Sequence, residues 1–597
     1  MAALFTTPKR NDKTSGAHFV EPDVRRRTLL AHGSWRRVTR RIVCGLACAL
    51  TVSSLLMPSV SLAAEWVDVG GVRHEAAAGP TGDAAGTWSW DGADDMRLNG
   101  YDGGAIQAAG KLNIAYEGKN TVKTEPDYTG AAIKAQDGTN QKAELNITSS
   151  KSSDELNVTA EADAIKSTGD LSISGPGTVN TTSTSSDGIE AKGDLSITGS
   201  GTVNATGGTE GIQSKGETTI DSSGTVIAKG GEGYGIAAGS DLIIKGGGKV
   251  EANSISIEEA AIWAKDGINI SDGSQVKANA EGYLAVDTEG SFAVTNASLD
   301  ASGVEYGVYA YKGVTLDHAT VTVRTSANGG QAIALITDGG DIDIKNGSIV
   351  DAFAEGKFSV AISTRNHQPN VAGGHIYISD SVVKTIARYV ETGGDGPDHY
   401  SNDQSGGVIP EPRGLNIGIF AQTYEGITPA SISIVRSKVT AEGDTAAIFA
   451  LATSEDGKAI GTIEIEGAPI QTPTGGKIIG YSNREALDDG IVYDMGQTIG
   501  TGDATINSPY DAAVAKSTVI VPPEEIKPEE KRGETKPEGF KSEGTKTTKT
   551  VAVAATGAKT TGKLAATGDA SNAAIVAAAL AGTAAIAAGA VVSRKRS

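Results

Sequence analysis

The chain has 597 residues, of which 78 are glycine and only 5% are aromatic, and it carries a formal net charge of -20. So acidic a chain is a poor partner for nucleic acid, because binding to phosphates needs clustered cations. Short runs of Val, Ile, Thr and Ser separated by Gly, Asp and Asn favour an all-β protein with tight turns over a helical one.

Residues 1–64 have the organisation of a signal peptide. A long arginine-rich region precedes an apolar run from Ile42 to Leu56, and small residues at Ala63 and Ala64 suit signal peptidase. The arginine pairs leave the twin-arginine export route open, although the residues after them fit its motif poorly. Both cysteines, Cys44 and Cys48, lie in this segment, so the mature chain would contain no disulfide or cysteine-bound metal.

A repeat of 22 to 26 residues begins after an expected N-terminal cap at residues 65–100 and extends over residues 101–518. Each repeat has three apolar sites, and turn-forming residues separate them. The first site recurs at Ile165, Ile189, Ile212, Ile236, Ile262, Val286, Val308, Ile333 and Ile362. The second recurs at Ile173, Ile197, Ile220, Ile244, Ile270, Val294 and Leu316, and the third at Val179, Val203, Val226, Val250, Val276, Leu299 and Val321.

Three short alternating strands per repeat are what one coil of a parallel β-helix requires. The pattern therefore predicts an all-β, single-stranded, right-handed parallel β-helix of about 12 to 14 coils, with three parallel sheets around an apolar bore. In the first strand a branched residue and the small residue two places later would point inward. The residue between them would point outward.

The stretch "DGIEAKGDLSITGSGTVNAT" at residues 187–206 and its neighbours resemble bacterial surface β-helices described as carbohydrate-binding, over roughly residues 100–350. One branch of these proteins binds acidic pectic polymers with calcium. The resemblance implies the fold and a polysaccharide or host glycan as partner.

Two outward ladders are candidate binding sites. The first consists of carboxylates at one position of successive coils: Asp170, Asp194, Glu217 and Asp241. Like charges one coil apart repel each other, and calcium would relieve that repulsion. The alternative is a solvated acidic face with lysines nearby, so no cofactor is certain.

The second ladder is aromatic and comprises Trp263, Tyr309, Phe420 and Phe449, all at the outward position of the first strand. Sugars stack on exposed rings, so this row is a candidate glycan platform. The alternative is that inserted loops cover the rings.

Catalysis has less support in the sequence. β-Helix enzymes that cleave pectin use clustered carboxylates with a neighbouring cation, and no such motif recurs at matching positions here. The nearest candidates are Arg365, His367 and Asp380. We therefore expect no enzyme, with a polysaccharide lyase or hydrolase as the alternative.

The C-terminal part begins with residues 519–563, a Pro-, Glu-, Lys- and Thr-rich segment with little to bury, which predicts a disordered spacer across the cell wall. Residues 564–597 follow. The segment 573–592 is apolar and long enough for a transmembrane helix, and a basic tail ends the chain.

The residues before that apolar segment are Leu564, Ala565, Ala566, Thr567 and Gly568. Together with it they resemble the cell-wall sorting signal of Gram-positive surface proteins, whose usual pentapeptide is Leu-Pro-x-Thr-Gly. The resemblance implies sortase and peptidoglycan as partners, cleavage after Thr567, and a membrane helix that is present only before cleavage. Ala565 replaces the usual proline, which leaves the sortase class open. A simple membrane anchor is the alternative.

These features predict a non-enzymatic, wall-anchored surface protein that acts as an adhesin or as a glycan-binding or structural rod.

Overall fold

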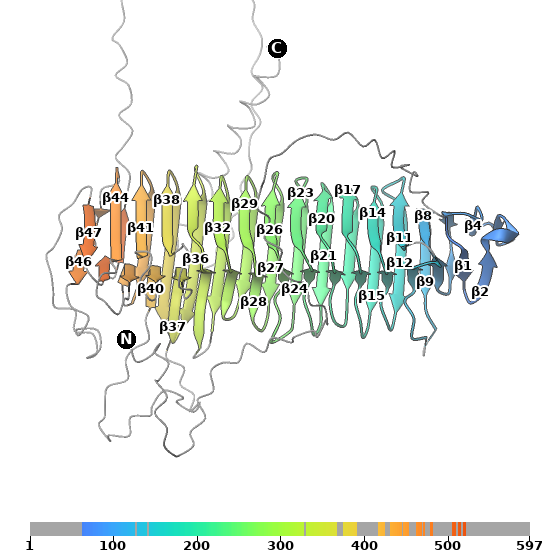
Figure 1. Ribbon diagram of the computed structural model, residues 1–597, viewed down its shortest axis with the longest axis horizontal. Coiled ribbons are helices and arrows are strands. Elements are labelled where there is room, and N and C mark those ends of the chain that lie inside the picture. The colour runs from blue at the N-terminus through green and yellow to red at the C-terminus, as the bar shows by residue number, and fades with distance from the viewer. Residues whose placement is uncertain are drawn as a thin grey trace, which may run out of the picture. The chain divides into compact units, whose positions relative to one another are not determined.

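A computed structural model describes residues 63–125, 128–139, 142–327, 330–366, 374–390, 416–423, 430–444, 446–452 and 461–467, together with five short strands between residues 470 and 520. Over this part the chain winds as a parallel β-helix, in which three strands per coil recur in the same order (Figure 1). The 36 strands from β7 to β42 make twelve complete coils in the described residues.

Sheet 1 takes the first strand of each coil, and three or four residues suffice in its earlier coils. Its strands are β1 (Trp66–Val69), β2 (Val72–Glu75), β7 (Ile106–Ala109), β10 (Ile133–Gln136), β13 (Ile165–Ser167), β16 (Ile189–Ala191), β19 (Ile212–Ser214), β22 (Ile236–Ala238), β25 (Ile262–Ala264), β28 (Leu284–Thr288), β31 (Tyr306–Ala310), β34 (Gln331–Asp338), β37 (Phe358–Asn366), β40 (Asn416–Thr423), β43 (Ala446–Ala452), β46 (Ile478–Tyr481) and β48 (Asp511–Val514).

Sheet 2 takes the second strand of each coil. Its strands are β3 (Thr81–Gly82), β4 (Trp88–Trp90), β5 (Asp95–Asn99), β8 (Lys111–Glu117), β11 (Glu144–Ser149), β14 (Asp170–Ser174), β17 (Leu195–Gly199), β20 (Thr218–Ser222), β23 (Asp241–Lys245), β26 (Gly267–Ser271), β29 (Ser291–Thr295), β32 (Gly313–Asp317), β35 (Ile342–Lys345), β38 (His375–Ser379), β41 (Ala430–Val435), β44 (Gly461–Glu466) and β47 (Ala504–Ser508).

Sheet 3 takes the third strand. Its strands are β6 (Asp102–Gly103), β9 (Lys119–Lys123), β12 (Glu155–Ala160), β15 (Thr178–Ser183), β18 (Thr202–Thr206), β21 (Thr225–Gly230), β24 (Lys249–Ser254), β27 (Gln275–Ala280), β30 (Ser298–Gly303), β33 (Thr320–Ser326), β36 (Ile349–Gly356), β39 (Val382–Tyr389), β42 (Lys438–Gly443), β45 (Ile470–Gln471) and β49 (Ser517–Ile520).

The predicted apolar rows are confirmed by the register of the three sheets. Ile173 pairs with Ile197 and Ile197 with Ile220 in sheet 2, and Val179 pairs with Val203 in sheet 3. In sheet 1, Ile165, Ile189, Ile212, Ile236 and Ile262 pair in succession and are completely buried. Their side chains form one continuous core along the inside of the coils.

One assignment in the first row is wrong. Val308 pairs with Leu335, and Leu335 with Ile362, so Leu335 and not Ile333 points into the bore. Ile333 pairs with Tyr306 and belongs to a second apolar cluster. β34 begins four residues before Leu335, so it contains two apolar residues at alternate positions, Ile333 and Leu335, and only Leu335 continues the inward row.

Antiparallel strands occupy both ends of the stack. At the N-terminal end β1 lies antiparallel to β7, β2 lies antiparallel to β1, and a 3-10 turn at Ala76–Ala78 follows. At the other end β47, β48 and β49 pair antiparallel with β44, β43 and β42. These strands use the hydrogen-bonding groups that an open edge of a parallel stack would otherwise expose.

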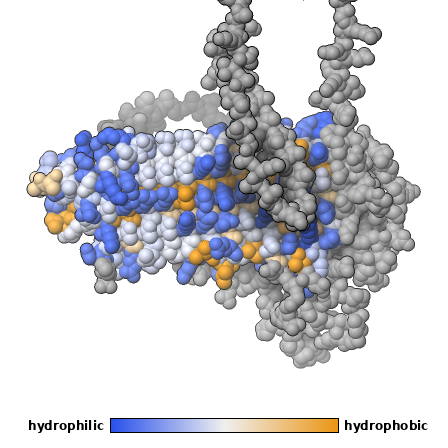
Figure 2. All heavy atoms as spheres, turned by 180° about the vertical axis from the view of Figure 1, so that it is seen from behind, coloured by the Kyte–Doolittle hydropathy of each residue, from blue (hydrophilic) through white to orange (hydrophobic). Residues whose placement is uncertain are grey.

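The outward positions are mostly polar. On the face that Figure 2 shows, hydrophobic residues form a narrow band along the coils, flanked by hydrophilic and neutral residues. Exposed large hydrophobic residues are few in the described part, and the most exposed are Ile257 at 78% and Ile255 at 61%.

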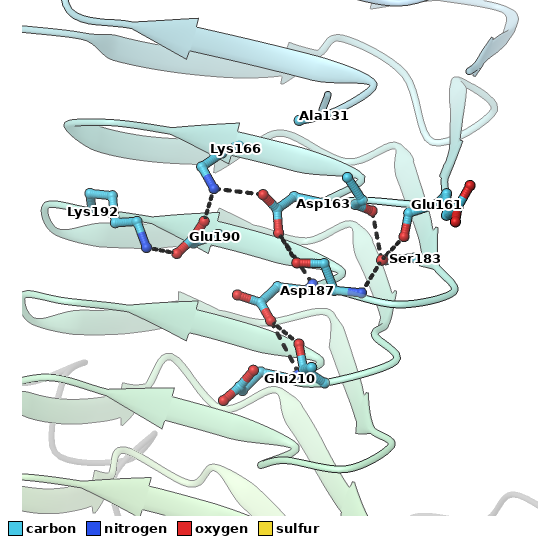
Figure 3. A network of polar contacts seen from close by, with 12 residues as sticks. Ala131, Glu161, Asp163, Lys166, Ser183, Asp187, Glu190, Lys192 and Glu210 are labelled. Atoms are coloured by element: carbon cyan, nitrogen blue, oxygen red, sulfur yellow. Dashed lines mark hydrogen bonds and ion pairs between the residues drawn. The ribbon is translucent and has the colours of Figure 1, made fainter. Parts of the chain in front are cut away.

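A polar network lies at the corner where sheet 3 leads into sheet 1 in neighbouring coils (Figure 3). Lys166 donates to Asp163 at 2.7 Å and to Glu190 at 2.5 Å, and Lys192 donates to Glu190 as well. The Asp187 carboxylate accepts hydrogen bonds from the Thr209 hydroxyl and the Glu210 backbone N–H. The network therefore ties several successive turns together.

The two aspartates of this network titrate in opposite directions. Burial, followed by the neighbouring Glu210 carboxyl, raises the pKa of Asp187 to about 8. Burial also acts to raise the pKa of Asp163, but the hydrogen bond and charge of Lys166 outweigh it and hold the pKa below the usual value. Within the part of the chain that the structure describes, Asp187 is thus a buried carboxyl without an ion pair, whereas Asp163 pairs with Lys166.

The inward row can be tested with a matched pair of substitutions. Ile212→Asp places an unpaired charge in the bore, where Ile212 is completely buried, and should cost at least ~3 kcal/mol of unfolding free energy. Ile243→Asp introduces the same change at an outward, half-buried position of β23 and should cost less than about 1 kcal/mol. Urea unfolding followed by circular dichroism measures both, and equal losses would contradict the assigned faces.

Asp187 should make stability depend on pH. The folded chain keeps a proton that the unfolded chain loses above about pH 4, so this stabilisation declines as the pH rises from about 4 to about 8. Asp187→Asn, which keeps the acceptor oxygen, should therefore raise the free energy of unfolding at pH 8.5 by on the order of 2 kcal/mol and leave it unchanged at pH 4. The thermal midpoint, measured at both pH values, should rise only at pH 8.5.

Asp163→Asn is the control for this prediction, because it removes the partner of Lys166 and should lower the midpoint at pH 8.5. The assignment of charge in the network would be contradicted if Asp163→Asn raised the thermal midpoint at pH 8.5. It would also be contradicted if Asp187→Asn did not raise that midpoint.

Candidate functional site

The outward row of sheet 1 changes character along the chain. The strand register places one residue of each coil in this row, and from β19 onward these are Gln213, Ala237, Trp263, Asp287, Tyr309, Ile336, Ser363, Phe420 and Phe449. All four aromatic residues selected from the sequence lie in it, so the row itself is as expected. Their surroundings differ between its two ends.

Phe420 and Phe449 do not form an exposed platform. They stack on each other with centroids 5.4 Å apart, and they are only 3% and 1% exposed. With Ile336, Val360 and Ile417 they belong to an apolar cluster on the outer side of sheet 1. A sugar would have no access to these two rings, so the predicted platform is limited to Trp263 and Tyr309.

Trp263 is half-buried and stacks on Tyr234, with ring centroids 5.6 Å apart and planes 26° apart. Tyr234 lies in the turn before β22, two residues ahead of the inward Ile236. Burial, followed by a hydrogen bond to Glu259, raises the pKa of the Tyr234 hydroxyl, which stays protonated and donates to that carboxylate. The pair presents two parallel rings from adjacent coils.

Three tyrosines extend this aromatic surface. Tyr306 makes edge-to-face contacts with Tyr283 and Tyr309, at centroid distances of 6.3 and 5.5 Å. The Tyr309 hydroxyl donates to Asp338 at 2.9 Å, and Arg365 lies 3.5 Å from the same carboxylate. These contacts fix Tyr309 in place, since both its ring and its hydroxyl have partners.

Asp287 occupies the row between Trp263 and Tyr309, one coil from each. Burial raises its pKa to about 7, and the nearby carboxylates of Glu289 and Glu259 contribute. Within the described residues it has no ion pair with a lysine or arginine. We call the surface formed by Tyr234, Trp263, Asp287, Tyr306 and Tyr309 the Trp263 face.

Sequence reasoning missed Tyr234, Tyr283, Tyr306 and Asp287. A signal was present for two of them, because Tyr234 and Tyr306 each precede an inward residue by two positions, in "YGI" and "YGV". Asp287 also had a signal, because it directly follows Val286 of the first inward row and so takes the outward position between Trp263 and Tyr309. The register confirms that position.

The acidic ladder does lie at one position of successive coils, as expected, but its oxygens have other partners. Asp170 accepts the backbone N–H of Asp194 at 2.9 Å, and Asp194 accepts that of Glu217 at 2.9 Å. Asp241 is the last carboxylate of the ladder, because it pairs in register with Gly267 of the next coil. Backbone donors thus already offset part of the repulsion that calcium was expected to relieve.

Two groups of three carboxylates have ligand oxygens within 4.8 Å of one another in the described part of the chain. They are Asp91, Asp94 and Asp95, and Asp163, Asp187 and Glu190. Neither contains a member of the predicted ladder. In the second group Lys166 and Lys192 already supply positive charge, and in the first the Asp91 carboxylate accepts the backbone N–H groups of Ala93 and Asp95.

The residues considered for catalysis have separate partners. Arg365 in β37 pairs with Asp338, while Asp380 in the turn after β38 receives two hydrogen bonds from Arg436, at 2.8 and 2.6 Å. His367 lies outside the described residues.

The predicted processing sites lie at or beyond the ends of the described part. Ala64 is completely buried in the core and Ala63 forms a bridge with Lys111. The spacer at 519–563 lies almost entirely outside the described residues, and the sorting residues Leu564, Ala565, Ala566, Thr567 and Gly568 and the apolar segment 573–592 lie wholly outside them. No helix within the described residues is long and apolar enough to cross a membrane.

Comparison with known proteins gives one match. Neither the curated proteins nor the solved structures contain a match to this chain. Residues 126–381 match the model of a family described as carbohydrate-binding domain-containing protein. This segment contains the whole Trp263 face, and the match supports carbohydrate binding by this part of the β-helix.

Proposed function

We propose that this protein is a non-enzymatic surface protein that binds a polysaccharide or host glycan through the Trp263 face and is covalently anchored to the cell wall. The observation that carries the binding proposal is the half-buried Tyr234–Trp263 stack, which lies on an outward row inside the segment that matches the carbohydrate-binding family. An adhesin would use such a site to attach to a glycan-bearing surface.

The Trp263 face has the components that sugar recognition uses. Pyranose rings present flat C–H faces that pack on aromatic rings, and their hydroxyls donate to carboxylates. Trp263 supplies a ring, and Asp287 supplies a part-exposed acceptor one coil away. Because the row follows the axis of the coils, a linear glycan lying along it would meet these groups in succession.

The same packing favours binding over catalysis. Hydrolysis or elimination needs an acid and a base that face one substrate, with freedom to exchange protons. Asp380 is held by Arg436, and Asp338 by Tyr309 and Arg365. These carboxylates have fixed partners, which suits a structural role.

Wall attachment rests on the sequence of the C-terminal segment. Sortase would cleave after Thr567 and join it to an amine of the peptidoglycan precursor, while the apolar segment 573–592 and the basic tail hold the chain in the membrane until cleavage. The mature protein would then be localised on the cell surface, in covalent linkage to the wall.

Glycan binding is tested with the secreted β-helix on a glycan array. Trp263→Ala should lower the signal for the bound glycans by about tenfold or more, because it removes the ring on which the sugar packs. Tyr377→Ala, at an outward tyrosine of β38 in sheet 2 that is 42% exposed, is the matched control and should leave the profile unchanged. An unchanged profile for Trp263→Ala would contradict the assigned face.

Anchoring is tested by fractionating cells that express the full chain. Thr567→Val should prevent release from the membrane and abolish wall linkage, because sortase would no longer recognise the residue whose carbonyl group it transfers. Thr560→Val, in the preceding spacer, should leave the protein in the wall fraction. Mass spectrometry of wall fragments of the unsubstituted protein should show peptidoglycan joined to Thr567, and its absence would exclude this route.

A further inference from the structure

Several carboxylates lie around the Trp263 end of the Trp263 face. Glu259 and Glu289 act on Asp287, and Glu259, Asp287 and Glu210 act on Tyr234. The neighbouring Tyr283 is likewise affected by Glu305, Asp287 and Glu259. At the other end of the face, the positive charge of Arg365 acts on Tyr306 and Tyr309. Arg365 is paired with Asp338. Within the described residues, the Trp263 end therefore has several carboxylates and no ion-paired cation.

Asp287 is the centre of this negative region. It lies one coil from Trp263 and one coil from Tyr309 in the outward row, and its side chain is partly buried. A carboxylate in such a place favours a neighbouring positive charge, because low-dielectric surroundings strengthen the attraction. Earlier in the same outward row, Glu190 meets this need with Lys166 and Lys192.

We propose that the Trp263 face selects an oligosaccharide with free amino groups, such as a glucosamine polymer, whose ammonium pairs with Asp287 while an adjoining sugar ring packs on Trp263. This inference rests on the proposed carbohydrate-binding function and names the class of sugar. A neutral or N-acetylated sugar offers only hydroxyl or amide donors to Asp287. A uronic acid brings a further negative charge to a region that already repels one.

The spacing of the row suits such a chain. Adjacent coils are ~4.8 Å apart, so Trp263 and Tyr309 lie two steps, ~10 Å, from each other with Asp287 halfway. This step is close to the length of one sugar unit in an extended β-linked chain. One unit would therefore pack on Trp263, the next would place its amine at Asp287, and the third would reach Tyr309.

The experiment measures affinity of the secreted β-helix for three hexamers by calorimetry: glucosamine, N-acetylglucosamine and galacturonic acid. The unsubstituted protein should bind the glucosamine hexamer at least tenfold more tightly than the acetylated one, and the galacturonic acid hexamer most weakly of the three. The binding should persist when a chelator is present. A chelator would abolish binding through a metal ion that bridges carboxylates, but not binding through an ammonium group of the sugar.

Two substitutions locate the preference. Asp287→Asn, nearly isosteric and uncharged, should lower affinity for the glucosamine hexamer about tenfold and leave the acetylated hexamer unaffected. Asp300→Asn removes the same charge from an exposed position of β30 in sheet 3 and should preserve the preference. Thermal midpoints establish that each variant is folded, and the comparison of hexamers on the unsubstituted protein needs no variant.

The outcomes distinguish this inference from the proposed function. If Trp263→Ala abolishes binding but the glucosamine and acetylated hexamers bind the unsubstituted protein equally, selection of the amine is excluded and carbohydrate binding remains. Tighter binding of galacturonic acid, or a requirement for calcium, also excludes it. If the array and all three hexamers give no binding, both proposals fail.

Discussion

The whole structure depends on one repeated contact, in which a branched aliphatic side chain packs on its counterpart in the next coil while the backbones of the two strands exchange hydrogen bonds. Ile189, Ile212 and Ile236 illustrate it, since each is completely buried and paired in register with the next. A shift of one residue would turn the apolar row outward, so the core fixes the register. The position of every outward side chain follows from this.

In-register stacking places like residues side by side, which is favourable for some side chains and costly for others. The amides of Asn157, Asn180 and Asn204 form a chain of hydrogen bonds, at 2.9 and 2.8 Å. Carboxylates in the same situation repel each other, and the chain compensates in different ways. Asp170 and Asp194 accept backbone N–H groups, whereas Asp163 has Lys166 as its partner.

Glycine matters where the coils approach most closely. A Cβ at Gly193 or Gly216 would lie 2.1 Å from a carboxylate oxygen of Asp170 or Asp194, respectively, so the hydrogen-bonded acidic ladder exists only because these positions have no side chain. Either alanine substitution would displace the carboxylate from its backbone donor. The recurrent "KGD" and "KGE" of the sequence is therefore part of one stacked unit.

The sequence predicts what repeats and is less informative about what does not. The inward rows were predictable from spacing, because each coil presents the same apolar sites. Ile333 was misassigned, since Leu335 two residues later satisfies the same pattern and only the pairing with Val308 distinguishes them. Burial of Phe420 and Phe449 was not predictable, because it depends on packing outside the repeat.

The Trp263 face likewise depends on packing between coils. Register brings an aromatic pair and an acid together, although the sequence of each coil is ordinary when taken alone. A β-helix can therefore acquire a binding site by outward substitutions alone, since the core that sets their spacing is unaffected.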